Sequence, residues 1–340
     1  MRDKVPFMVA VVPFSDEQAR LLVNLGQRYA LWIAAEQALT SMPYDLKRKL
    51  INGHYYLYEV FDRIGNGKSL GRWSDDAARQ YDEYRVAKSR EKQRRESGRA
   101  LLDESARLYR ALRLPLLSSD AGPILREADR RQLLGSHLLV VGTNAMLAYS
   151  IEAGGTIVAP DETEDFDLAW VSESTADDHM PIWDLLKAVD PTFSINSERD
   201  FQARNAKAYE VEILVAPSRS GSLGATDRPR PIPLDEQEWL LLGRPVDQVL
   251  GCRDGSPARI VAPDPRWFAL HKLWMAAQAK RNPLKRPKDH KQGVALLDAV
   301  ATSMPHYPFD AEFESAMPIE LEPYYADWCS ARPAPTPSKW

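Results

Sequence analysis

The chain has little cysteine, no long apolar run and no excess of positive charge. Cys252 and Cys329 are its only cysteines, so the sequence excludes a disulfide framework and predicts a reducing, cytoplasmic location. No segment approaches the roughly 20 apolar residues that a membrane-spanning helix needs. The apolar run over 6–14 contains two prolines, which makes it a poor signal peptide. The formal net charge of −4 argues against a generally basic nucleic-acid binder and leaves only local patches for such a role.

The length and composition indicate an ordinary globular protein. The 340 residues allow two domains or one large one, and 44% of them are apolar, which is a normal share. We predict a mostly helical region over 1–120 with an aromatic hairpin near 54–73. A core follows over 121–233, and a mainly helical region over 234–340.

Helix signals fix most of the predicted elements. Apolar periodicity, Ser caps and Pro or Gly at helix ends predict five helices. A stretch rich in Ser, Gly, Arg and Pro predicts one loop. The helices cover 16–42 with Ser15 as its cap, 74–113 with Ser74 as its cap, Pro123–Leu134, Trp267–Lys280 and Asp289–Thr302, and the loop covers 217–233.

Two acids on one predicted strand are the strongest chemical signal. Side chains alternate along a strand, so Asp165 and Asp167 share one face while Phe166 points to the other. Two carboxylates forced together repel unless a cation lies between them. A hard divalent ion such as Mg²⁺ prefers oxygen ligands and binds nucleotide phosphates as well. An isolated Asp-x-Asp also occurs on solvated strand faces, so the pattern needs further support.

A third acid comes from a later strand. The run over 208–215 alternates, with Glu210 and Glu212 on one face and apolar residues on the other. If this strand lies beside the Asp165 strand, a three-carboxylate cluster forms. Such a cluster can hold two metal ions for an in-line phosphoryl displacement. Glu212 lies deeper in the apolar run, so we expect it, rather than Glu210, to be the third ligand.

A glycine turn precedes both strands. Val140 and Val141 end a predicted buried strand, and Gly142, Thr143 and Asn144 open a helix. A glycine lets a phosphate approach the backbone, and a helix N-terminus favours negative charge. We therefore expect all three residues of the turn to contact the substrate. We also expect Gly142→Val to impair nucleotide binding with little change in folding.

These pieces, in this order, resemble the DNA polymerase β-type nucleotidyltransferase superfamily. The resemblance is nearest to a bacterial branch of nucleotidyltransferase-fold proteins related to the type IV toxin–antitoxin enzymes of abortive infection. It departs at Glu212, where the pattern usually has Asp. The matching motifs are Gly142-Thr143-Asn144-Ala145 with Tyr149, the Thr163–Asp167 strand, Tyr56-Leu57-Tyr58, Ser69-Leu70-Gly71, His271-Lys272-Leu273 and Lys288-Asp289.

The resemblance implies an α+β fold with a mixed-sheet, polymerase β-like nucleotidyltransferase core. It implies transfer of a nucleoside monophosphate from an NTP to a hydroxyl of RNA or protein, with two Mg²⁺ ions, or Mn²⁺ in their place. Asp165, Asp167 and Glu212 would be the catalytic and metal-binding residues. The resemblance extends to a toxin-like role, while the sequence itself gives no support for an antitoxin partner. The alternatives are a non-catalytic nucleotide- or RNA-binding regulator and an enzyme that modifies a small molecule such as an antibiotic.

Several further residues fit two interpretations. Lys272 fits a snorkelling lysine as well as a triphosphate contact. Lys288 fits a surface ion pair with Asp289, although the resemblance favours a substrate role. The basic run over 85–99 and the aromatic hairpin fit either ordinary surface and packing or contacts with nucleic acid.

Overall fold

The computed structural model describes residues 10–160, 165–173, 182–224 and 227–332, and these form an α+β fold, as predicted. Thr163, part of the predicted strand motif, lies outside this range. Within the described ranges, no helix is both long and apolar enough to cross a membrane.

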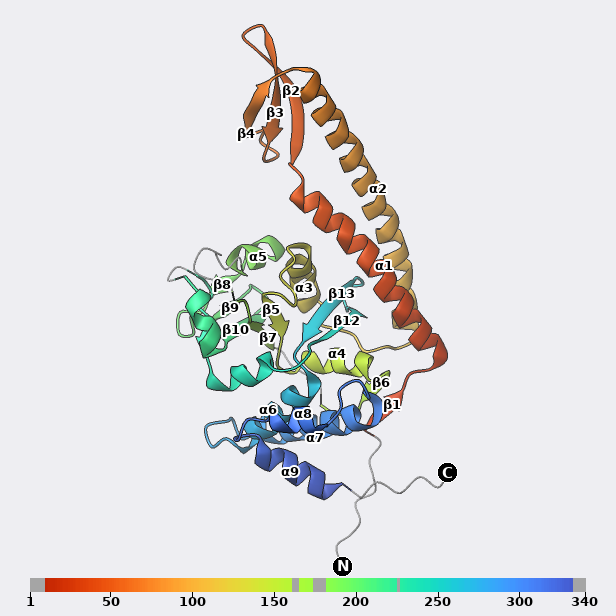
Figure 1. The fold of residues 1–340 in the computed structure, drawn as a ribbon, viewed down its shortest axis with the longest axis vertical. Coiled ribbons are helices and arrows are strands. Elements are labelled where there is room, and N and C mark those ends of the chain that lie inside the picture. Colours follow the sequence, from red (N-terminus) through yellow and green to blue (C-terminus); the bar gives the residue numbers. More distant parts are fainter. Residues whose placement is uncertain (1–9, 161–164, 174–181, 225–226, 333–340) are drawn as a thin grey trace, which may run out of the picture.

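Two long helices form an arm that projects from the rest of the molecule (Figure 1). They are α1 (Asp16–Ser41) and α2 (Asp75–Ala111). The Ser15 hydroxyl accepts a hydrogen bond from the Gln18 backbone N–H, and Ser74 caps α2 from the Ala77 N–H. Both predicted caps are therefore confirmed, and each satisfies a backbone donor that the first helical turn leaves without a partner.

A three-stranded antiparallel sheet forms the tip of the arm. Its strands are β2 (Asp45–Ile51), β3 (His54–Val60) and β4 (Gly67–Arg72), in the order β2-β3-β4. The predicted aromatic hairpin is thus present as β3 and β4, while β2 was not predicted. Basic and polar residues dominate β2, and they mask its alternation.

The central sheet is mixed, with the order β5-β7-β10-β9-β8, and β11 also pairs with β10. The strands β7 and β10 run parallel, whereas β5 and β9 pair antiparallel with β7 and β10 respectively. The bounds are β5 (Leu138–Val140), β7 (Asp165–Trp170), β8 (Ser194–Ile195), β9 (Gln202–Arg204), β10 (Glu210–Val215) and β11 (Ile232–Pro233).

Helices and a hairpin surround this sheet. The helices of this part are α3 (Ala121–Arg130), α4 (Ala145–Glu152) and α5 (Ile182–Val189). A second hairpin, β12 (Val246–Gly251) with β13 (Pro257–Ala262), contacts β5, α3 and α4. It lies in the region expected to be mainly helical and was not predicted. A small antiparallel pair joins β1 (Val11–Pro13) to β6 (Gly155–Ile157).

The C-terminal helices pack at one end of the molecule (Figure 1). They are α6 (Pro265–Ala277), α7 (Arg286–Ser303), α8 (Ala311–Ser315) and α9 (Glu322–Ala331). Two 3₁₀ turns, η1 (Pro217–Ser222) and η2 (Asp235–Leu241), precede β12. The predicted loop over 217–233 therefore contains η1 and β11. The predicted helix over 123–134 begins at Ala121 and ends at Arg130, because a turn with Gln132 at positive φ follows it.

Gly293 in α7 lets α7 approach α6 closely. A β-carbon there would lie 2.7 Å from Leu273 Cγ and 2.8 Å from the Ala269 carbonyl oxygen, so the helices would have to separate. We expect Gly293→Ala to lower the free energy of unfolding by about 1–3 kcal/mol. Chemical denaturation measures the change.

The matched control is Gly26→Ala in α1, where a β-carbon meets no atom within 4 Å. There the substitution should raise stability by about 0.5–1 kcal/mol, because alanine loses less backbone freedom on folding. Equal effects at the two positions would show that the α6–α7 approach is not tight.

Candidate active site

A cavity of about 650 Å³ brings together most of the predicted site residues. One wall comes from the turn after β5 and from β7 and β10, and the other from α6, α7 and the segment between them. Leu234, Glu236 and Gln237, which precede β12, complete the lining. Gly142, Thr143, Asp165, Asp167, Glu212, Lys272 and Lys288 all line it. Asn144 is the one predicted site residue that does not.

Parallel pairing of β7 and β10 places the acids side by side. In this register Glu212 is opposite Asp167, and Glu210 is opposite Asp165. Glu212 lines the cavity, but Glu210 does not. Glu210 instead forms an ion pair with Arg204 at 3.2 Å. Gln202 on β9 donates to both glutamates, at 2.9 Å to Glu210 and 3.0 Å to Glu212.

The turn after β5 holds β7 in place. The Val141 backbone N–H donates to the Asp167 carbonyl at 3.0 Å, and the Asn144 side-chain amide donates to the Asp165 carbonyl at 3.0 Å. Thr143 and Asn144 are both buried. Asn144 therefore orients the backbone that carries the acids, which differs from the substrate contact we expected of it.

Gly142 is required for a different reason than the one predicted. Its φ is +68°, a conformation that side chains rarely adopt, and a β-carbon would lie 1.9 Å from Asp167 Oδ2. The expectation that Gly142→Val would leave folding nearly unchanged is therefore wrong. The space beside the glycine is filled by the catalytic candidate Asp167 itself.

Burial and mutual repulsion raise the pKa values of two of the acids. Burial raises the pKa of Asp167 to about 7, and the charge of Glu212 adds to the effect while Lys272 opposes it. Burial and the neighbouring Asp165 raise the pKa of Glu212, while the Gln202 hydrogen bond opposes the rise. The negative charges of this wall are thus close enough to disfavour one another.

The opposite wall carries positive charge, organised by one buried acid. Asp289 is buried and accepts hydrogen bonds from Lys272 Nζ at 3.0 Å and from Arg281 Nε at 2.8 Å. Lys272 is itself buried, so it is neither a snorkelling lysine nor exposed to bulk water. Asp289 pairs with these two cations, which differs from the surface pair with Lys288 that the sequence also allowed. Lys288 lines the cavity.

Sequence reasoning missed Arg281 and Lys285. Both line the cavity, and Lys285 Nζ lies 3.2 Å from Asp165 Oδ2, which joins the two walls. The available signal was the basic segment between the two predicted C-terminal helices, Lys280–Lys288. Its prolines suggested only an interrupted loop, because nothing in the local pattern shows that this loop returns to β7.

The acids do not form a closed metal site as their side chains lie. In the part of the chain that the structure describes, no three His, Cys, Asp or Glu side chains are arranged to hold a metal ion. Asp165 is turned toward Lys285, and Glu212 toward Gln202. The donor set still fits a hard divalent cation, since it consists of carboxylate oxygens on adjacent strands whose charges repel.

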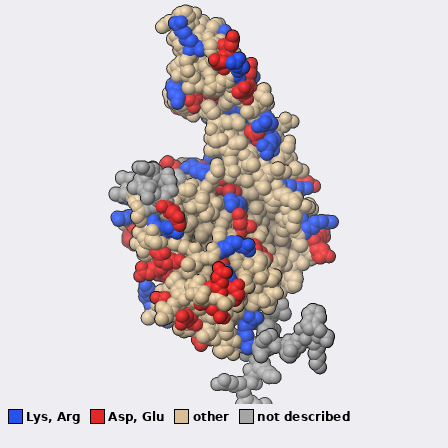
Figure 2. Space-filling view, in the orientation of Figure 1, with Lys and Arg blue, Asp and Glu red and all other residues tan. Residues whose placement is uncertain are grey.

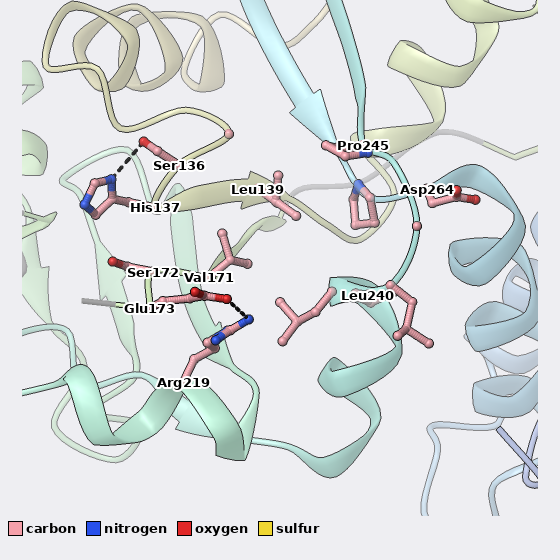
Figure 3. Close-up of a pocket in the computed structure, with 15 residues that line it drawn as sticks. Ser136, His137, Leu139, Val171, Ser172, Glu173, Arg219, Leu240, Pro245 and Asp264 are labelled. Carbon is pink, nitrogen blue, oxygen red and sulfur yellow. Dashed lines mark hydrogen bonds and ion pairs between the residues drawn. The ribbon is translucent and has the colours of Figure 1, made fainter. Parts of the chain in front are cut away.

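A second cavity of about 460 Å³ lies toward the other ends of β5 and β7 (Figure 3). Its lining includes Leu139, Val171 and Leu240, and an ion pair of 2.7 Å joins Glu173 to Arg219. None of the predicted site residues lines it. The paired acids and cations that phosphoryl chemistry needs are therefore found in the first cavity.

Residues 119–318 match the model of a protein family described as Nucleotidyltransferase. The chain belongs to this nucleotidyltransferase family. The match includes every residue of the two cavity walls, and it makes the protein a transferase of nucleotidyl groups.

Comparison with solved structures gives the crystal structure of an antigenic nucleotidyltransferase-like protein from Paracoccidioides brasiliensis. The sequence identity is 18% and the TM-score 0.35, and the match covers 64% of this chain and 91% of that one. A comparison with curated proteins gave no match.

Removal of Asp289 should strongly destabilise this family member. Asp289→Ala leaves the buried Lys272 ammonium without its carboxylate, and an uncompensated buried charge costs about 3–5 kcal/mol. We expect a loss of that order in the free energy of unfolding measured with urea. The matched control is Lys285→Ala, whose side chain is about half exposed and whose pairing contributes at most about 1 kcal/mol. Equal losses would mean that Asp289 does not stabilise a buried charge.

His271 should make stability depend on pH. It lies beside Trp239 and Phe268, and no described residue forms a hydrogen bond with its ring nitrogens. Burial lowers the pKa of His271 to about 3, and Lys272 contributes. The unfolded chain binds a proton near pH 6.5 and the folded chain does not, so stability falls as pH drops from about 6.5 toward 3.

Below pH 6, His271 should lower the free energy of unfolding by about 1.4 kcal/mol for each pH unit. His271→Phe keeps an aromatic ring and removes the titration. Denaturation curves at pH 7, 6 and 5 should therefore show a smaller loss of stability in the variant than in the wild type. Parallel losses in the two proteins would contradict the assignment of this pH dependence to His271.

Proposed function

We propose that the protein transfers a nucleoside monophosphate from an NTP to an acceptor hydroxyl and releases pyrophosphate. The observation that carries the proposal is the cavity with three acids on one wall and four cations on the other. The acids are Asp165, Asp167 and Glu212, and the cations are Lys272, Arg281, Lys285 and Lys288. An NTP bound with Mg²⁺ presents complementary charges to both walls.

The acids would hold Mg²⁺, or Mn²⁺ in its place. When bound there, the metal supplies charge neutralisation at the reacting phosphoryl group. The repulsion that raises the pKa of Asp167 and of Glu212 favours such a cation. The site would close by turning Asp165 away from Lys285 and Glu212 away from Gln202.

The chemical step is an in-line displacement at the α-phosphorus. The acceptor oxygen forms a bond to this phosphorus, the bond to the bridging oxygen of pyrophosphate breaks, and the hydroxyl proton passes to Glu212. A raised pKa suits this carboxylate for accepting a proton. Most of the rate enhancement in such reactions comes from positioning and charge stabilisation.

The cationic wall would hold the triphosphate. Asp289 fixes Lys272 and Arg281 against each other, so their charges are placed before the substrate arrives. Lys285 would leave its ion pair with Asp165 and bind a phosphate of the substrate. Substrate binding would thereby free Asp165 to bind the metal ion. Lys288 would add a fourth charge from α7.

The turn after β5 would bind the triphosphate from the opposite wall of the cavity. Gly142 and Thr143 line the cavity at the start of α4, where backbone N–H groups and the helix dipole favour an anion. Thr143 would offer its hydroxyl to the same phosphate.

The proposal also covers the organisation and setting of the protein. The chain would divide into an N-terminal region over 1–120, a catalytic core over 121–233 and a C-terminal region over 234–340 that supplies the cations. RNA or protein as the acceptor, a toxin-like role and a cytoplasmic location remain predictions from the resemblance.

The test is transfer of radiolabel from each α-labelled NTP to total cell RNA or protein in the presence of Mg²⁺. The wild type should label one fraction and release pyrophosphate. Asp167→Asn should reduce the rate by about 10²–10³-fold, because it removes a carboxylate that would hold the divalent cation at the reacting phosphoryl group. Circular dichroism should show an unchanged fold. Transfer by Asp167→Asn at the wild-type rate would overturn the proposal.

The two glutamates of β10 form a matched pair. Glu212→Gln should cause a loss of transfer rate comparable to that of Asp167→Asn, since Glu212 faces the cavity. Glu210→Gln should change the rate less than about threefold, because Glu210 lies outside the cavity and pairs with Arg204. The reverse ranking would show that Glu210 is the functional acid.

A further inference from the structure

A basic groove lies along the arm, away from the catalytic cavity. It has a volume of about 730 Å³, and its lining includes residues of α1, α2 and the tip sheet together with Arg130 at the end of α3. We call it the arm groove. No residue lines both this groove and the catalytic cavity. Its cations are Arg63, Arg85, Lys88, Lys92, Arg95 and Arg130, and its acids are Glu36 and Asp45.

Three of the six cations already have partners. Glu127 holds Arg130 with oxygens at 2.6 Å, and Glu36 lies 3.9 Å from Arg95. Lys88 donates to the Pro43 carbonyl at 3.0 Å and to the Tyr84 hydroxyl at 2.6 Å, so it joins α2 to the start of the tip sheet.

The other three, Arg63, Arg85 and Lys92, are exposed and have no carboxylate partner among the described residues. Arg85 lies over the ring of Tyr81, 5.6 Å from its centroid. The groove therefore carries a positive field in a chain whose formal net charge is −4. Such a field favours an anion with more than one charge.

Exposed aromatic rings accompany these charges. Tyr44 lines the groove and is 49% exposed. On the tip sheet, Tyr55 is 45% exposed with Arg48 3.8 Å above its ring, and Phe61 lies near Lys68. Aromatic rings alternating with cations stack unpaired bases and bind the phosphates between them.

The tip sheet does not contribute to the main hydrophobic core. Its buried residues Leu46, Leu57 and Val60 pack outside that core, and α2, with 37 residues, extends about 55 Å. Figure 2 shows Lys and Arg side chains at the tip and on the flank of this arm, with acids among them. The tip sheet projects from the molecule and does not stabilise the main core, so its surface is available for binding.

We propose that the arm groove, together with the exposed rings of Tyr55 and Phe61 at the tip sheet, binds single-stranded RNA. The cations contact phosphates, and Tyr44 with the rings of the tip sheet stacks on bases that are not paired. If the bound RNA is also the acceptor of the nucleotidyl group, that role rests on the proposed function. The binding of RNA to the arm is independent of the proposed function. A duplex binds less tightly, because its bases are stacked on each other and are not free for the rings.

The test is fluorescence anisotropy with a labelled 25-nucleotide single-stranded RNA and the full-length protein. The variant is Arg85→Glu/Lys92→Glu, and the matched control is Arg79→Glu/Arg107→Glu, which makes the same charge change on α2 outside the groove. At about 0.1 M salt the groove variant should raise the Kd at least about tenfold. Its salt slope should also be smaller by about 1.4, since each lost single-strand phosphate contact removes about 0.7.

The control variant should stay within about threefold of the wild type. Tyr44→Ala should weaken RNA binding without changing the salt slope, because stacking releases no counterions. Equal losses in the groove and control variants would overturn the proposal, as would unchanged binding in the groove variant. Polyglutamate should displace the labelled RNA less effectively, per charge, than unlabelled RNA does. If the two competitors were equally effective, the proposal would be overturned and an acidic polypeptide would be identified as the ligand.

RNA binding by Asp167→Asn separates this proposal from the catalytic one. We expect its Kd for RNA to equal that of the wild type, since Asp167 lies in the other cavity. Loss of nucleotidyl transfer together with intact RNA binding supports the arm site whatever the reaction is. Loss of RNA binding in Asp167→Asn would place the RNA in the catalytic cavity and overturn the separate site.

Discussion

The repulsion between carboxylates on β7 and β10 is the constraint on which the candidate active site depends. Parallel pairing sets Glu212 directly beside Asp167, and burial removes the water that would screen them. Proton uptake at a raised pKa relieves this repulsion, and so does nearby positive charge. The loop between α6 and α7 provides it through Lys285, while Asp289 keeps two further cations at the same cavity. The two walls therefore stabilise each other, and a divalent ion with a triphosphate would extend the same charge balance.

Local patterns predicted the elements on which this region is built. Ser15 and Ser74 mark the starts of the two long helices, because a capping side chain acts on its own first turn. Alternation in β7 and β10 predicted which acids share a face, since the period of a strand is a local property. Glu212, which we chose over Glu210 as the third metal ligand, lines the cavity while Glu210 does not, and its role as a ligand stays a prediction.

Features that depend on distant parts of the chain could not be predicted in this way. The ion pair between Lys285 and Asp165 joins residues 120 positions apart, and no pattern around either residue reveals the other. Asp289 looked like a surface residue because its partners, Lys272 and Arg281, come from a preceding helix and loop. The hairpin of β12 and β13, by contrast, was missed although its local pattern favours it: valine occurs in both strands and isoleucine in β13, and Asp254-Gly255 lies between them.

The contact between Gly142 and Asp167 has a consequence for how the site can change over time. The glycine has no side chain because the carboxylate occupies the space, and its positive φ adds a second restriction. Substitutions at the two positions are therefore energetically coupled, so their effects do not add. A smaller residue at position 167 would remove the collision but leave the backbone restriction. Position 142 can therefore accept a side chain only after both the acid and the turn have changed. Asp167 can be replaced while Gly142 is kept, whereas a side chain at position 142 requires that position 167 has changed first.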